Sequence, residues 1–80
     1  MNAVPDITNV DDRKIVVRKL LEWQAGQTHF TCRFFDLYAS ADSRNRKFLA
    51  EGFPLEASVF DEWNTTGGDV KAVLRKRYGL

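Results

Sequence analysis

Hydrophobic residues recur along this chain at the spacing of α-helices, in runs separated by glycine, proline and capping residues. A first helix is expected to begin at Thr8 or Asn9, because both residue types can accept hydrogen bonds from unpaired N–H groups and acidic residues follow. Gly26 is expected to end it. The apolar stripe of this helix consists of Val16, Val17, Leu20, Leu21 and Trp23.

A second helix is expected after Thr28, which can serve as its cap. Its apolar positions fall at i, i+4, i+7, i+8 and i+11, which matches one face of a helix. These positions are Phe30, Phe34, Leu37, Tyr38 and Ala41. The alternative is a β-hairpin formed by residues 14–36, which would give an α+β fold, because residues 29–35 have strand-like character. We favour the helix, since the alternation of apolar and polar residues breaks at Phe34-Phe35 while the helical spacing continues.

The junction Glu51-Gly52-Phe53-Pro54 predicts the end of one helix and the start of the next. Gly52 can take the left-handed conformation that closes a helix, and Pro54 suits the first helical position because its missing N–H has no partner there. Phe53 lies between them and is expected to enter the core. The helix before this junction is expected to begin with a cap at Asp42 or Ser43 and to point Phe48 and Leu49 inward.

Two further helices complete the predicted order. One runs from Pro54 to about Asn64 and presents Leu55, Val59, Phe60 and Trp63 on one face. The last is capped by Asp69 and closed by Gly79, with Leu80 folding back over its end. Its apolar residues are Val70, Val73, Leu74 and Tyr78.

The whole pattern predicts a single all-α domain over residues 1–80, a compact bundle of four to five short helices. Residues 1–8 are expected to form a flexible N-terminal arm. Six Phe, two Trp and two Tyr are expected to supply most of a small core. The expected core residues are Val17, Leu20, Leu21, Phe34, Leu37, Val59, Phe60 and Trp63, with Phe48, Phe53, Val73 and Leu74 at its ends.

The charge balance gives the chain no strong overall field. Twelve Lys and Arg oppose eleven Asp and Glu, for a formal net charge of +1, so any electrostatic function must depend on a local patch. The N-terminus lacks the basic flank and apolar run of a signal peptide, and no stretch approaches the ~18 apolar residues of a membrane span. We therefore expect a cytoplasmic protein that does not enter a membrane.

The single Cys32 and single His29 limit the chemistry that the chain can carry. They exclude an internal disulfide and a Cys- or His-rich metal site, and no cofactor is expected. The two residues are three apart and would be neighbours on a helix, which is the minimum of a thiol nucleophile. No local motif supplies an orienting group or an oxyanion hole, so we interpret Cys32 as a structural cysteine and do not expect an enzyme.

The glycines at Thr66-Gly67-Gly68-Asp69 invite comparison with a phosphate-binding loop. The segment lacks the lysine and the hydroxyl residue of a P-loop, and no strand clearly precedes it. It is therefore interpreted as a turn between helices.

The aromatic content favours a protein-binding module, because so small a domain cannot bury every large apolar side chain. Phe35 follows Phe34 and so points about 100° away from it on a helix. Trp23 and Phe35 are the expected anchors for a protein partner, with Arg44 and Arg46 as charges at the rim. A homodimer would bury the same residues on both copies.

Nucleic-acid binding is the alternative function. The C-terminal helix carries Lys71, Arg75, Lys76 and Arg77, which could contact phosphates. The equal abundance of acidic residues weighs against this interpretation, as does the tendency of cations to gather at helix C-termini.

The segment from Ala41 to Trp63 resembles short helical proteins encoded by bacteriophages and prophages. The shared features are the Ala-Asp cap at 41–42, the Asn45-Arg46 pair, the Phe53-Pro54 junction and the downstream Trp63. The resemblance implies no activity and no site residues. It implies a phage or mobile-element accessory or regulatory protein that acts on a larger bacterial or phage component.

Overall fold

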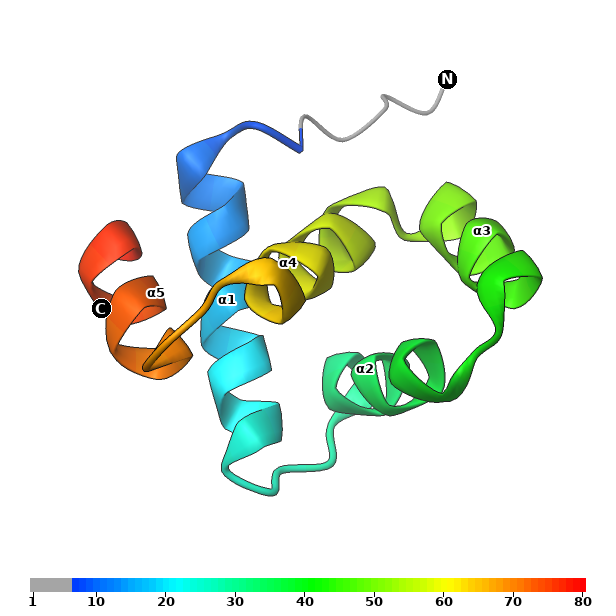
Figure 1. Ribbon diagram of the computed structural model, residues 1–80, viewed down its shortest axis with the longest axis horizontal. Coiled ribbons are helices and arrows are strands. Elements are labelled where there is room, and N and C mark those ends of the chain that lie inside the picture. Colours follow the sequence, from blue (N-terminus) through cyan, green and yellow to red (C-terminus); the bar gives the residue numbers. More distant parts are fainter. Residues whose placement is uncertain (1–6) are drawn as a thin grey trace.

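The computed structural model describes residues 7–80, which form five α-helices and no strand (Figure 1). The helices are α1 (Val10–Gln24), α2 (Phe30–Ser40), α3 (Ser43–Gly52), α4 (Pro54–Thr65) and α5 (Val70–Tyr78). The all-α prediction is confirmed, and the hairpin alternative for residues 14–36 is wrong, because this region holds α1, a turn and the start of α2. Most of the expected arm, residues 1–6, lies outside the described residues.

Side-chain caps start three of the helices as the sequence predicts. Asn9 accepts a hydrogen bond from the Asp12 N–H at 3.0 Å and begins α1. Asp42 and Asp69 do the same for α3 and α5, at 2.8 and 3.3 Å. The prediction for Thr28 is wrong. His29 occupies the N-cap of α2 without a capping side-chain bond, and the Thr28 carbonyl instead accepts a hydrogen bond from the Arg33 side chain.

The junction between α3 and α4 forms where it was predicted, but not by the expected conformation of Gly52. Gly52 is the last residue of α3 and does not have a positive φ. The chain turns instead at half-buried Phe53 (φ −134°, ψ 63°), and Pro54 begins α4. Left-handed glycines do close the other two predicted ends: Gly26 follows α1 with φ 93°, and Gly79 follows α5 with φ 68°.

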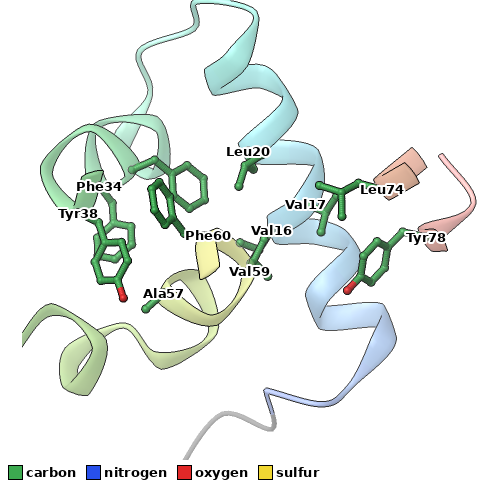
Figure 2. Close-up of a cluster of buried hydrophobic side chains, with 11 residues drawn as sticks. Val16, Val17, Leu20, Phe34, Tyr38, Ala57, Val59, Phe60, Leu74 and Tyr78 are labelled. Carbon is green, nitrogen blue, oxygen red and sulfur yellow. The ribbon is translucent and has the colours of Figure 1, made fainter. Parts of the chain in front are cut away.

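Helix α1 lies between α5 on one side and α2 with α4 on the other (Figure 1), and α3 packs mainly against α4. Figure 2 shows Val17 facing Leu74 between α1 and α5, while Phe34, Tyr38 and Phe60 gather between α2 and α4. The buried core consists of Val16, Val17, Leu20, Phe34, Phe35, Tyr38, Ala57, Val59, Phe60, Leu74 and Tyr78. Leu21, Phe53 and Trp63 pack against it as partly buried residues, as does Leu80, which was expected to fold back over α5.

Helix α2 is rotated relative to the predicted orientation. Phe30 and Leu37, which were expected in the core, are 72% and 56% exposed, whereas Phe35 is completely buried. The observed core face is displaced by about one residue, or roughly 100° around the helix. The reason is that apolar side chains occupy a wider arc of α2 than α1 and α4 cover. Periodicity locates this arc but does not show which edge stays uncovered.

The predicted orientation of Phe48 on α3 is also wrong. Its side chain is 56% exposed, while Leu49 and Ala50 turn toward the core. Phe48 follows Arg44 and Asn45 by one helical turn and therefore shares their polar side of α3. At the far end of the fold, Val73 is also more exposed than predicted, and Leu74 makes the contact with the core.

Candidate functional site

Two exposed apolar side chains lie beside the turn that joins α2 to α3, and a third lies at the start of α2. Leu37 and Phe48 line one hollow of about 460 Å³ together with Ser40, Ala41, Asp42, Asn45 and Leu49. Phe30 lies two turns before Leu37 on the same side of α2, with its ring centroid 6.0 Å from that of Phe53. We call Phe30, Leu37 and Phe48 the α2–α3 surface. Each of the three side chains is more than half exposed.

Arg46 holds the two helices of this surface in a fixed arrangement. Its Nε donates to the Tyr38 carbonyl and its Nη2 to the Ala39 carbonyl, both at 3.0 Å, at the end of α2 where helix carbonyls lack the usual intrahelical partners. The guanidinium also lies 5.3 Å from the Tyr38 ring centroid and 5.9 Å from that of Phe60. Arg46 was expected at the rim of a partner site. Its half-buried side chain is instead engaged within the chain.

Arg44 lies at the edge of the α2–α3 surface. Its guanidinium carbon is 5.9 Å from the centroid of the Phe48 ring, and the residue is exposed. Among the described residues it forms no ion pair, so its charge is available to a ligand. Arg44 is thus the predicted rim residue that the structure brings next to exposed apolar side chains.

The two predicted anchors lie within the fold. Phe35 is completely buried, so the expectation that it points to solvent is wrong: the neighbouring helices cover that side of α2. Trp23 is half-buried, and its Nε1 donates to Asp36 Oδ1 at 2.8 Å. Its ring centroid lies 5.5 Å from those of both Phe35 and Trp63.

Phe30, Leu37 and Phe48 were not identified as exposed residues from the sequence. For Phe48, the polar residues on the same side of its helix could have indicated the exposure.

Cys32 and His29 are neighbours, as their spacing predicts. The Cys32 Sγ lies 3.2 Å from His29 Nε2, and the same nitrogen lies 2.9 Å from Glu22 Oε1. The thiol also donates to the Lys19 carbonyl at 3.8 Å. Burial raises the pKa of the completely buried Cys32 thiol, and the charge of Glu22 raises it further. An activated nucleophile needs a lowered thiol pKa and solvent access, so these features are those of a structural cysteine.

The most connected polar cluster joins α1, α4 and α5. Arg13 donates to Glu62 Oε1 at 2.7 Å, to Ser58 Oγ at 2.8 Å and to the Tyr78 hydroxyl at 3.1 Å. The Tyr78 hydroxyl donates to Glu62 at 2.5 Å, and Arg77 also pairs with Glu62. Burial alone would raise the pKa of Glu62, but these hydrogen bonds outweigh it and lower the pKa below its ordinary value. The polar groups of this cluster form hydrogen bonds and ion pairs with one another, so the cluster is suited to fixing the positions of the three helices.

The predicted nucleic-acid residues Lys71, Arg75, Lys76 and Arg77 are all exposed on α5. Arg77 is occupied by its ion pair with Glu62. Lys71, Arg75 and Lys76 have no ion-pair partner among residues 7–80. Arg77 therefore has a structural role, whereas the charges of Lys71, Arg75 and Lys76 are available to a ligand.

Residues 7–80 contain no group of three or more His, Cys, Asp or Glu side chains that could hold a metal ion. None of the described helices combines the length and apolar character that crossing a membrane requires. No protein-family model matches the sequence, and neither the curated proteins nor the solved structures give a match.

Proposed function

We propose that this chain is a small, non-enzymatic protein-binding module that engages its partner through the α2–α3 surface. The observation that carries the proposal is the exposure of Leu37 and Phe48 beside one hollow, with exposed Phe30 two turns before Leu37 on the same side of α2. Burying apolar surface is worth about 25 cal/mol per Å², so covering two phenylalanines and a leucine supplies a useful part of a binding free energy. Aromatic side chains at the centre of an interface are typical anchors of binding.

The charges around the surface favour a partner segment that is apolar and carries a carboxylate. Arg44 lies over Phe48 and is free to pair with such a group. Asp42 lines the same hollow, but its side chain already accepts the N-capping bond of α3. A partner that places a carboxylate beside the apolar contact would therefore meet an unpaired cation there.

We extend the proposal to the setting that the resemblance of residues 41–63 implies. The α2–α3 turn, Arg44 and Phe48 all lie in this segment. We propose a phage or mobile-element accessory or regulatory protein, working in bacterial cytoplasm on a larger bacterial or phage component.

The test is capture of a partner from nuclease-treated bacterial lysate with tagged wild-type chain and three variants. Leu37→Glu and Phe48→Glu each place a charge in the α2–α3 surface and are expected to lose the partner band. Ile15→Glu is the matched control, because Ile15 is 55% exposed and lies on α1, outside that surface. It is expected to retain the band. Far-UV circular dichroism establishes that all three variants remain helical.

Equal retention of the band by Leu37→Glu and Phe48→Glu would contradict the proposal, as would equal loss in Ile15→Glu. Size-exclusion chromatography with light scattering addresses a second copy of the chain as the occupant. A wild-type dimer that Leu37→Glu converts to a monomer would replace the proposed partner with self-association.

A further inference from the structure

The unpaired positive charge of this chain is unevenly distributed. Among residues 7–80, some cations have no hydrogen bond, ion pair or aromatic contact. They are Lys14, Arg18, Lys19, Lys47, Lys71, Arg75 and Lys76. All of them except Lys47 belong to α1 or α5, two helices that lie side by side at one end of the molecule (Figure 1). The net charge of +1 hides this local concentration.

Side chains from the two helices converge on one face. Arg18 of α1 and Arg75 of α5 line the same hollow of about 510 Å³, with Leu21, Gln27 and Leu80 beside them. Lys14 precedes Arg18 by one turn. Its Nζ lies 4.0 Å from the position that a Cβ atom on Gly79 would occupy, so Lys14 reaches the end of α5. Lys71 precedes Arg75 by one turn on α5. We call Lys14, Arg18, Lys71 and Arg75 the α1–α5 face.

Few acidic groups offset these cations. Helix α5 contains no acidic residue, and α1 has Asp11 and Asp12 in its first turn. Glu22 also lines the hollow, and its Oε1 lies 2.9 Å from His29 Nε2. The hollow therefore presents two guanidinium groups and one carboxylate.

We infer that the α1–α5 face binds the phosphate backbone of nucleic acid. Arg18, Lys71 and Arg75 are exposed and Lys14 is half-buried. The cations of each helix are spaced by one turn of about 5.4 Å, which suits a polymer of repeated phosphates. The nucleic-acid residues predicted from the sequence lie on α5. The structure places Arg18 and Lys14 of α1 beside them, while Arg77 is paired with Glu62. Within the hollow, Leu21 and Leu80 are partly buried and supply no exposed apolar anchor for a membrane surface, and a comparison with lipid vesicles separates the two ligands.

The test is fluorescence anisotropy with a labelled DNA duplex of about 20 base pairs, at salt concentrations rising from about 50 mM. Four phosphate contacts predict a slope of about −3.6 for log K against log salt, at roughly −0.9 per contact. The double variant Arg18→Glu/Arg75→Glu is expected to lower the affinity by about tenfold or more, since two cations become anions. The matched control is Arg33→Glu/Lys47→Glu, which changes the charge equally on α2 and α3 and should have a much smaller effect.

Three results would overturn the inference: no binding at low salt, equal losses in the two double variants, or stronger binding to phosphatidylserine vesicles than to DNA. Equal losses would mean that net charge governs binding, and the vesicle result would make this a membrane face. Leu37→Glu distinguishes this inference from the proposed function. It is expected to keep DNA binding while losing the protein partner, so either proposal can fail without the other.

Discussion

At the scale of single residues, the carboxylate of Glu62 links three helices. Its carboxylate accepts hydrogen bonds from Arg13 on α1, and from Tyr78 and Arg77 on α5. The side chains of Glu62 and Arg13 are only 17% and 14% exposed, so solvent screens this pair less than a surface ion pair. One carboxylate thus ties α4 to the two helices that carry the α1–α5 face.

Replacing this carboxylate should lower stability in a pH-dependent way. The pKa of Glu62 is lowered in the folded chain, so its stabilising contribution is present above the unfolded value of about 4.3 and is lost as pH falls through the lower folded value. Glu62→Gln is expected to reduce the free energy of unfolding by about 2 kcal/mol near neutral pH, below the full cost of breaking a buried pair because the site is partly exposed. Urea unfolding of both proteins measures the difference.

The difference between wild type and Glu62→Gln should shrink as the pH falls below about 4, because the wild-type carboxyl group also becomes neutral. Glu51→Gln is the control, since Glu51 is exposed and has no ion pair among the described residues. A pH-independent difference for Glu62→Gln would mean that its ionisation does not stabilise the fold.

At the scale of elements, helix ends were more predictable than helix orientations. Asn9, Asp42 and Asp69 act through local hydrogen bonds, so their residue types and positions were sufficient to locate three helix starts. The orientation of α2 depends on which neighbours cover it, and adjacent Phe34 and Phe35 fit more than one orientation. The same reason explains why the candidate surface was predicted at Phe35 and found at Phe30 and Leu37.

Because of the observed orientation of α2, alanine substitutions of two phenylalanines on this helix are expected to differ in their effect on stability. Phe35→Ala would leave a cavity in the core and is expected to cost about 3 kcal/mol or more, enough to unfold much of so small a domain. Phe30→Ala removes an exposed ring and is expected to cost about 0.5 kcal/mol or less. Chemical unfolding followed by circular dichroism compares the two variants. The reverse order of stability would contradict the observed orientation of α2.

At the scale of the whole molecule, one aromatic cluster spans three helices. It includes every tyrosine, tryptophan and phenylalanine of the described residues except Phe48 and Tyr78, and it joins α1, α2, the α3–α4 junction and α4. The sequence predicted that aromatic residues would dominate the core. It did not predict the pairing, because residues as distant as Trp23 and Trp63 meet only through the packing of α1 against α4.

This cluster predicts cooperative unfolding. Both tryptophans belong to it, so tryptophan fluorescence should report loss of the core, while far-UV circular dichroism reports loss of all helices. The two thermal transitions are expected to coincide, as in a two-state domain. Helix α5 contributes no ring to the cluster and contacts the core through Leu74 and Tyr78. Loss of circular dichroism before the change in fluorescence would show instead that α5 unfolds separately.

The arrangement of α3 and α5 has a consequence for how the chain could connect two ligands. These helices lie at opposite ends of the longest dimension, 33 Å, with α1 and α4 between them (Figure 1). A protein held at Leu37 and Phe48 and a nucleic acid held at the α1–α5 face would therefore lie at different ends of the molecule. The chain would act as a short rigid spacer, and its effect would be to raise the local concentration of the bound protein along the nucleic acid.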